Sequence, residues 1–482
     1  MAADLLATSE HAVSIPTSVT VLFGLLLAAM IVALALEEKL HAKKSIIAGL
    51  FAGICLFLGA VFHLLPFESV VVGSSAAPEQ ATDGQVVHVG GHEIQMPVFI
   101  PAVDWSVIAI IVGSSLFVDV ASRSGLFTWI ALRVTKSTGG DPVWLLIAYG
   151  MMTVVFSALL NNVTAMIIVG SLTVVSLRKL ERPELMLSFL LIEGLLTNIG
   201  GLLTLISSVP NIIVGGAAGI TFLEFTEHAA PFVLLATVAT LAMGCWLFGI
   251  RRLRDAEERK QAAELIAGFD ENDGIESRGF FWFSAVMLVL FVGLIATTNQ
   301  LPFISDLQMG FVALAMAGIM LVRYKSAVDQ FYRGLDWDLL FFFMALFVVI
   351  NVMEHAGVLN AIGMLLARVI DVGETAGTAS ILIASAGFSS VTDNIPLAAM
   401  LAKILTSLGT ASDSPLWWSV VFGANLGGNL TPIGSASTLV AVTIMHKHGL
   451  PISFAGFIRH ALPFAALHIV LATAYVLLFL SH

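Results

Sequence analysis

The chain has 482 residues, of which 58% are hydrophobic and only 11% are charged, and its formal net charge is −11. Because soluble domains carry roughly 25% charged residues, this composition excludes an ordinary water-soluble protein and indicates a multi-pass membrane protein. No basic patch points to nucleic acid. Cys55 and Cys245 both lie in apolar runs, which excludes a disulfide framework and a cysteine metal site.

Long apolar runs predict an all-α integral membrane fold. A helix needs roughly 20 apolar residues to cross the bilayer core, and about ten runs meet this condition. These predicted spans are 17–36, 45–65, 105–125, 185–217, 231–250, 279–298, 307–322, 338–356, 416–443 and 461–480. The runs 185–217 and 416–443 carry Gly, Asn and Pro near their centres, so we expect both spans to be broken.

Two further apolar stretches, 142–178 and 376–406, are interrupted by Asn161-Asn162 and Asp393-Asn394. Each is too short for two ordinary spans with a soluble turn, which favours a re-entrant hairpin of two half-helices with a polar tip. Two complete spans in each stretch remain the alternative.

Two polar segments interrupt the apolar pattern. In the outer segment 67–101, the arms Gln85–Val89 and His92–Met96 predict a β-hairpin that turns at Gly90-Gly91. The segment 251–278 is charged and helix-prone through Ala267, and we interpret it as a cytoplasmic linker.

The basic residues set the orientation. With the N-terminus outside, all of the 22 Lys and Arg residues except Arg368 and Lys403 fall on the cytoplasmic side. Both termini are therefore expected to be extracytoplasmic, in the inner (plasma) membrane of a bacterium.

The sequence repeats itself. Four motifs recur at a spacing of 232 positions: Val103-Asp104-Trp105 as Leu335-Asp336-Trp337, Ser124-Gly125-Leu126 as Ala356-Gly357-Val358, Phe156-Ser157 as Phe388-Ser389, and Asn161-Asn162-Val163 as Asp393-Asn394-Ile395. A further block recurs at a spacing of 227 positions: Asn198-Ile199-Gly200-Gly201 matches Asn425-Leu426-Gly427-Gly428, and Thr204 matches Thr431. We therefore divide the chain into N-terminal spans with the outer hairpin segment (1–102), repeat 1 (103–250), the linker (251–278), scaffold spans (279–334) and repeat 2 (335–482).

The two repeats have opposite membrane topologies, because the predicted chain crosses the bilayer an odd number of times between Asp104 and Asp336. Inverted repeats with discontinuous helices are typical of secondary transporters, whose sites lie at the repeat interface near the membrane midplane.

The hairpin tips and broken spans are therefore expected to meet and bind an ion or small substrate. Glycine lets backbone groups face a ligand, and Asn and Thr supply neutral oxygens. The candidate residues are Asn161, Asn162, Thr164, Thr197, Asn198, Gly200, Gly201, Thr204, Asp393, Asn394, Asn425, Gly427, Gly428 and Thr431, with Asn162, Asn198, Asp393, Asn394 and Asn425 as candidate Na⁺ ligands.

Three carboxyl groups in apolar surroundings are candidates for proton coupling: Asp393, Asp119 and Glu193. A carboxyl group shielded from water can exchange a proton near neutral pH, and it loses that proton when it binds Na⁺. One such residue would couple the two ions by competition.

The segment Glu193–Gly219 resembles the ion transporter superfamily, and in particular the arsenite permease and NhaD-type antiporter group with its P-protein-like permeases. Phe156–Gly170, Ser389–Met400 and Gly423–Val442 agree with this resemblance, which covers roughly residues 100–480. The resemblance implies a homodimer with a scaffold and a transport domain that moves like an elevator. Dicarboxylate carriers of the superfamily have Ser-Asn-Thr tips, which this chain lacks.

These observations make Na⁺/H⁺ or Li⁺/H⁺ antiport the leading hypothesis. Na⁺-coupled symport of an anion or dicarboxylate, and efflux of arsenite or antimonite, are the alternatives. Na⁺ and H⁺ would be coupling ions, and no cofactor is expected. An enzyme is disfavoured, because the sequence has no helical His pair for a metal, no Gly-x-Ser-x-Gly and no phosphate-binding loop.

Overall fold

The computed structural model describes residues 15–65, 69–73, 89–95, 97–272, 274–275, 277–325, 328–370, 372–392, 394–450 and 452–480. Within these residues the chain is almost entirely helical, and eleven helices are long and apolar enough to cross a membrane. The predicted helical membrane fold is therefore confirmed. Asp393 lies outside the described residues.

The chain divides into two compact units. Unit 1 comprises Met1–Asp104 and Phe341–Leu365, and unit 2 comprises Trp105–Leu340 and Leu366–His482. In unit 1, α1 (Thr17–Ala35) packs against α3 (Lys44–Val61), and the short α2 (Glu37–Leu40) connects them. Leu25 and Phe57 leave 64% and 68% of their surfaces uncovered, as expected of apolar side chains that face lipid.

The outer segment of unit 1 contains two antiparallel strands, β1 (Ser69–Gly73) and β2 (Val89–Gln95). The expected hairpin had a different register. Gly90-Gly91 lies inside β2 rather than at a turn, and the partner strand is β1, which bulges where Gly73 faces both Val89 and Gly90. A bulge accommodates one extra residue without a turn; most of the predicted arm Gln85–Val89 lies outside the described residues.

The two repeats have the same order of helices. Repeat 1 is formed by α4 (Trp105–Ser122), α5 (Leu126–Ser137), α6 (Pro142–Leu159), α7 (Asn162–Lys179), α8 (Met186–Gly200), α9 (Val209–Ala218) and α10 (Phe222–Leu247), with the 3-10 turn η1 (Pro183–Leu185) before α8. Repeat 2 is formed by α15 (Trp337–His355), α16 (Val358–Ile370), α17 (Glu374–Ser389), α18 (Asn394–Ser407), α19 (Pro415–Gly427), α20 (Ala436–Lys447) and α21 (Phe454–Phe479). Between them lie α11 (Ala256–Ala267), α12 (Arg278–Thr297), the 3-10 turn η2 (Thr298–Gln300), α13 (Ile304–Arg323) and α14 (Val328–Gly334).

The repeat extends further than the sequence motifs showed. Helices α10 and α21 both contain 26 residues, and they begin 232 positions apart. The hydroxyls of Thr221 and Ser453 cap their N-termini, and Pro231 and Pro463 occupy the same place inside them. These matches identify a seventh equivalent helix in each repeat.

Each predicted hairpin is a pair of helices joined at the expected polar break. Helix α6 ends at Leu159 and α7 begins at Asn162, and both contain 18 residues. In repeat 2, α17 ends at Ser389 and α18 begins at Asn394. Since α6 and α7 are each long and apolar enough to cross a membrane, the re-entrant depth of the hairpins stays a prediction.

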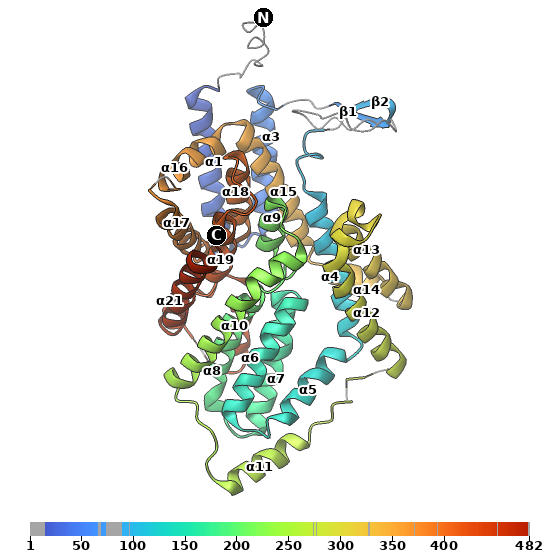
Figure 1. Cartoon of the computed structure of the whole chain (residues 1–482), viewed down its shortest axis with the longest axis vertical. Helices are drawn as coiled ribbons and strands as arrows, with labels where there is room; N and C mark the ends of the chain where they lie inside the picture. Colours follow the sequence, from blue (N-terminus) through green and yellow to red (C-terminus); the bar gives the residue numbers. More distant parts are fainter. Residues whose placement is uncertain are drawn as a thin grey trace, which may run out of the picture. The chain divides into compact units, whose positions relative to one another are not determined.

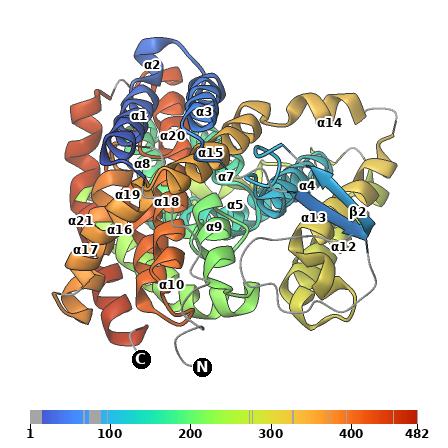
Figure 2. The same ribbon diagram turned by 90° about the horizontal axis from the view of Figure 1, so that it is seen from above.

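The two broken spans are broken where expected, and their second halves exchange partners. Helix α9 packs against α18 and α19 of repeat 2, whereas α20 packs against α7 and α8 of repeat 1. Figure 1 shows α6, α7 and α8 together, and Figure 2 shows α17, α19 and α21 side by side. A reciprocal exchange of this kind is the pattern of a two-fold axis.

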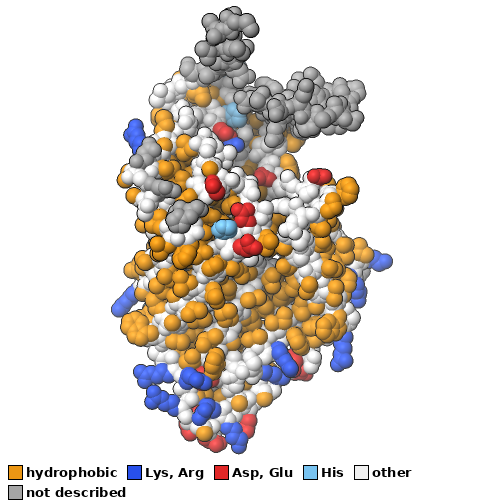
Figure 3. Space-filling view, in the orientation of Figure 1, with side chains coloured by type: hydrophobic (Ala, Val, Ile, Leu, Met, Phe, Trp, Pro, Cys, Tyr) orange, Lys and Arg blue, Asp and Glu red, His pale blue; other side chains and the backbone are white. Residues whose placement is uncertain are grey.

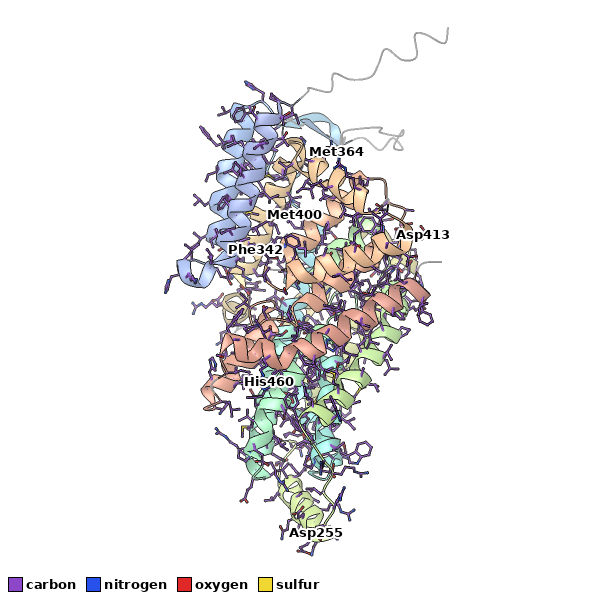
Figure 4. All side chains as sticks on the ribbon, turned by 90° about the vertical axis from the view of Figure 1, so that its left-hand side faces the viewer. Asp255, Phe342, Met364, Met400, Asp413 and His460 are labelled. Carbon is purple, nitrogen blue, oxygen red and sulfur yellow. The ribbon has the colours of Figure 1, made fainter. Side chains whose placement is uncertain are left out.

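The linker lies over the end of unit 2 where basic residues gather. Asp255 caps α11, which ends at Ala267 as expected. In Figure 3, Lys and Arg surround this end below a broad apolar band, and Figure 4 places Asp255 there and Asp413, in the loop before α19, toward the other end. Such a charge distribution agrees with a cytoplasmic linker.

Candidate functional site

The tip of the first hairpin is attached to the first broken span. The hydroxyl of Ser157, at the end of α6, lies 2.6 Å from Asn162 Oδ1 and 2.6 Å from the backbone oxygen of Thr197. Asn161 caps α7, since its Oδ1 accepts from the backbone N–H of Thr164 at 2.7 Å. The hydroxyl of Thr204 donates to the backbone oxygen of Ala158 at 2.8 Å, which fixes the break against α6.

The second hairpin has the equivalent contacts. Ser389 donates to the backbone oxygen of Ala424, and Thr431 donates to that of Ser390, both at 2.5 Å. These four residues are the repeat equivalents of Ser157, Ala158, Thr197 and Thr204, which make the matching bonds in repeat 1. These shared contacts explain why the hydroxyl positions match between the two repeats.

Two asparagines cross between the repeats at the breaks. Asn198, in α8, donates to Ser435 Oγ at 3.0 Å, and Ser208 donates to Asn425 Oδ1, in α19, at 2.7 Å. Asn198 and Asn425 are 227 positions apart, as are Ser208 and Ser435, so the two bonds join equivalent residues, although the amide donates in the first and accepts in the second. Each serine precedes the second half of its broken span. We call Asn198, Asn425, Ser208 and Ser435 the crossed pair.

Further amides surround the crossed pair. Asn198 also donates to Asn429 Oδ1 at 2.8 Å, and its Oδ1 accepts from Ser437 at 3.1 Å. Asn425 donates to Asn211 Oδ1 at 2.9 Å. All four asparagines are buried, with at most 2% of their surface exposed.

The donors of this cluster are used, whereas its oxygens keep capacity. Asn425 donates its second N–H to the backbone oxygen of Val421, and Asn211 donates both to the backbone oxygens of Gly201 and Thr204. Backbone oxygens only accept, so these bonds fix which end of each amide is nitrogen. Because an amide oxygen has two lone pairs, Asn198 and Asn425 each retain an acceptor site, and the cluster is better suited to a cation than to an anion.

A buried histidine supports the cluster from α21. Asn429 donates to His468 Nδ1 at 3.2 Å, so Nε2 of His468 carries the hydrogen and donates to Thr240 Oγ1 of α10 at 2.7 Å. Thr240 in turn donates to the backbone oxygen of Ala236. The imidazole is therefore neutral and fully bonded, and it connects the crossed pair to the two long helices.

The predicted glycines provide close packing at the breaks. A Cβ at Gly200 would lie 2.6 Å from the backbone oxygen of Val154, and one at Gly427 would lie 2.3 Å from that of Ala386. At Gly201 the nearest atom would be Asn162 Nδ2, at 2.8 Å, and at Gly428 it would be the backbone oxygen of Gly434, at 3.0 Å. These glycines bring helices together, and the amides and hydroxyls beside them supply the polar atoms.

Glu193 is buried in α8, with none of its surface exposed. Its Oε1 accepts from Thr173 Oγ1 of α7 at 2.5 Å, and its Oε2 has no hydrogen-bond partner. The repeat equivalent of Glu193 is Val420, so this carboxyl group has no counterpart in repeat 2.

Asp119 makes its contacts away from the crossed pair. It is half-buried in α4, and its Oδ2 lies near Gly334 at the end of α14. Thr197 uses its hydroxyl within α8, where it donates to the backbone oxygen of Gly194 at 2.6 Å. Asn394 begins α18 and is half-buried. Among the described residues there is no group of three His, Cys, Asp or Glu residues that could hold a metal ion.

Sequence reasoning missed several members of the cluster. Ser208 and Ser435 share the 227 spacing and could have been found from it. The sequence gives no comparable signal for Asn429, Ser437, Thr240 and His468, because their repeat equivalents are different residues.

The fold and the buried polar cluster define an integral membrane secondary transporter. A protein-family model described as a citrate transporter matches residues 70–423, and the chain belongs to this family. An uncharacterized transporter of Mycobacterium bovis is 32% identical over 380 residues, which cover 78% of this chain and 86% of the relative. The P protein of Mus musculus is 24% identical, and the match covers 98% of this chain and 64% of that protein.

Two solved structures share the fold. The YdaH transporter of Alcanivorax borkumensis superposes with a TM-score of 0.56 at 13% identity, covering 95% of this chain and 97% of that chain. MtrF of Neisseria gonorrhoeae, described with a class of antimetabolite efflux pumps, superposes with a TM-score of 0.55 at 12% identity. The match covers 91% of this chain and 95% of that chain. The family model and the relatives found by sequence confirm the expected ion transporter relationship.

Proposed function

We propose that this secondary transporter exchanges Na⁺ or Li⁺ for protons, and that the metal ion binds at the crossed pair. The observation that carries this proposal is the imbalance of hydrogen-bonding capacity at the site. The amide donors of Asn198, Asn425 and Asn211 are bonded within the protein, whereas the oxygens of Asn198 and Asn425 can accept further. Neutral oxygens of this kind are suitable ligands for a small hard cation.

Proton exchange requires a carboxyl group that can lose its charge. Glu193 lies five residues before Asn198 in the same helix and is buried without a cationic partner. Asp393 is the repeat equivalent of Asn161 and precedes Asn394 in the sequence. A carboxylate that gains a proton as the cation leaves would keep the site near neutrality in both states.

The exchanged halves of the broken spans support an elevator-type motion. Helix α9 packs on α18 and α19, and α20 packs on α7 and α8. These helices would therefore have to move as one body, which an elevator requires. A homodimer in the inner membrane of a bacterium, with both termini outside, is part of the same proposal.

Carboxylate symport is a second candidate, and the citrate transporter family favours it. The N-terminus of α9 has no side-chain cap, and the positive end of a helix dipole attracts anions. No Lys or Arg belongs to the described polar cluster, so a citrate ion would need an accompanying cation.

The proposal is tested in proteoliposomes that enclose a pH-sensitive dye. Na⁺, Li⁺, citrate, succinate and arsenite are added in turn to the wild type, to Asp393→Asn and to Asp413→Asn as a matched control. We expect Na⁺ or Li⁺ alone to dissipate an imposed pH gradient, Asp393→Asn to abolish this, and Asp413→Asn to leave it unchanged. A response to citrate or arsenite without one to Na⁺ or Li⁺ would refute the exchange of these cations for protons.

A further inference from the structure

We infer that Glu193 is a proton-binding site that exchanges with the basic end of unit 2 through a buried chain of hydroxyl groups. This inference rests on the proposed function, because it assigns a proton to Glu193 in addition to the role proposed for Asp393, and it gives the route by which that proton enters. Three observations support it: the open oxygen of Glu193, a hydroxyl chain on the neighbouring helices, and the place where that chain ends.

Glu193 has the environment of a group that takes up a proton. Its Oε1 is bonded to Thr173, and its Oε2 is fully buried without a partner. A buried carboxylate with one bare oxygen is costly, because nothing replaces the water that it has lost. Protonation of the carboxylate removes the charge, whereas a cation bound nearby would favour the charged form.

A set of buried hydroxyls begins beside Glu193. Thr173 and Ser176 are three residues apart on α7, so their side chains lie on the same face of that helix. Ser176 Oγ is 2.6 Å from the hydroxyl of Tyr149 on α6, and this hydroxyl is 2.9 Å from Thr135 Oγ1 on α5. Thr135, Tyr149, Thr173 and Ser176 are all fully buried.

The hydrogen bonds of this chain have a defined direction. Thr135 donates to the backbone oxygen of Ala131, so it accepts from Tyr149, which in turn accepts from Ser176. These bonds point from Ser176 toward Thr135, so each hydroxyl has to turn and reverse its bond when a proton passes toward Glu193. Thr173 gives its own proton to Oε1 of Glu193 and takes one from the chain, and release reverses both steps, so no other reactant is needed.

The chain ends beside the basic end of unit 2. Thr135 precedes Lys136, which together with Arg133 pairs with Glu271 of the linker. This is the end of unit 2 at which Lys and Arg gather in Figure 3. The route therefore joins the predicted cytoplasmic side to a carboxyl group one and a half helical turns from Asn198.

Other titratable groups on the helices around α8 lie toward helix ends. They are Arg178 and Lys179 on α7, Glu224, Glu227, His228 and Cys245 on α10, and His446 and Lys447 on α20, with Glu184 in η1. On α6, Tyr149 is the titratable group of the hydroxyl chain, and its hydroxyl bonds to Thr135 and Ser176.

The test compares wild type with Glu193→Gln, Tyr149→Phe and Tyr475→Phe in proteoliposomes. Tyr475 is the matched control, because its hydroxyl donates to the backbone oxygen of His228 and belongs to no chain. Two rates are measured: cation-driven proton movement, and exchange of labelled Na⁺ for unlabelled Na⁺ without a pH gradient.

We expect Glu193→Gln to abolish proton movement and to retain Na⁺ exchange. Tyr149→Phe should slow proton movement by on the order of tenfold or more, and leave Na⁺ exchange and the KM for Na⁺ unchanged. Tyr475→Phe should match wild type. Proton movement at the wild-type rate in Glu193→Gln or Tyr149→Phe would overturn the inference, as would an equal loss of both rates in folded protein.

An infrared titration decides the inference independently of transport. Wild type should show a protonated-carboxyl band that disappears as the pH is raised, and Glu193→Gln should lack it. If wild-type vesicles show no cation-driven signal, the proposed antiport fails, and the infrared band still tests Glu193 as a proton site. An unchanged band in Glu193→Gln would overturn the assignment of that site.

Discussion

Single side chains hold the two repeats together through amide groups that are buried and almost fully bonded. Asn198 makes three side-chain bonds across the repeat boundary, and Asn425 makes two. Loss of one partner leaves several buried polar atoms unpaired. Each unpaired atom lowers the stability of the folded state by more than the hydrogen bond had contributed to it. The residues that we propose as ion ligands are therefore also structural.

Asn198→Ala should destabilise the protein by about 1–3 kcal/mol, because Asn429, Ser435 and Ser437 each lose a partner. Thermal unfolding in detergent measures this, with Thr443→Ala as control, since Thr443 is exposed on α20 and bonds only within its helix. Ser208→Ala and Asn425→Ala combined in a double-mutant cycle should show positive coupling. Strict additivity of that pair would contradict the bond between them.

At the scale of elements, close glycine contacts decide how the hairpins meet the broken spans. Gly200 allows α8 to approach α6, and Gly427 allows α19 to approach α17, at equivalent positions of the two repeats. Backbone atoms line both contacts, so neither can yield as a flexible side chain would. These contacts explain the matched glycines better than ligand access does.

Gly427→Ala should therefore lower the free energy of unfolding by about 1–3 kcal/mol, the usual cost of overpacking. Gly216 lies exposed in α9, and a methyl group added there would meet no atom within 4 Å. Gly216→Ala should instead raise stability by up to about 1 kcal/mol, because alanine favours helix. Equal effects of the two substitutions on the melting temperature would contradict this assignment.

The linker is a second element whose attachment depends on defined contacts. Glu271 pairs with Arg133 and Lys136 at the end of α5, and Lys179 lies 3.9 Å from the ring of Phe269. The hydrogen bond from Lys136 lowers the pKa of Glu271 below its ordinary value. The contribution of this ion pair to stability is therefore fully present at a pH above the ordinary carboxyl pKa. It is lost as the pH falls through the lowered pKa of Glu271.

Hydrogen exchange of residues 256–272 measures that attachment. We expect protection of the linker at neutral pH and loss of protection in acid, and we expect Glu271→Gln to lack protection at both. Glu264→Gln, on the exposed side of α11, should behave as wild type. Protection of the Glu271→Gln linker at neutral pH would show that the ion pair does not hold it.

At the scale of the whole chain, the sequence alone predicts much of the architecture. Apolar runs located the spans, the linker helix ended at Ala267 as expected, and the matched motifs identified two repeats. The exchange of α9 and α20 could not be predicted, because a fixed spacing shows equivalence and not contact. His468 and Thr240 were missed because their repeat equivalents, Ala236 and Ala472, are apolar, so the repeat gives no signal for them. The β register was wrong because Gly90-Gly91 has the composition of a turn and lies in a strand.

The central claim is that a sodium ion binds at the crossed pair, and the most direct measurement is the effect of Na⁺ on thermal stability. Choline at equal ionic strength is the reference, and Asn425→Ala is compared with wild type and with Thr443→Ala. At a tenfold excess over its Kd, Na⁺ should stabilise wild type and Thr443→Ala by about 1.4 kcal/mol relative to choline. The stability of Asn425→Ala should be the same in Na⁺ as in choline. The same stabilisation of Asn425→Ala, or none of wild type, would contradict the claim.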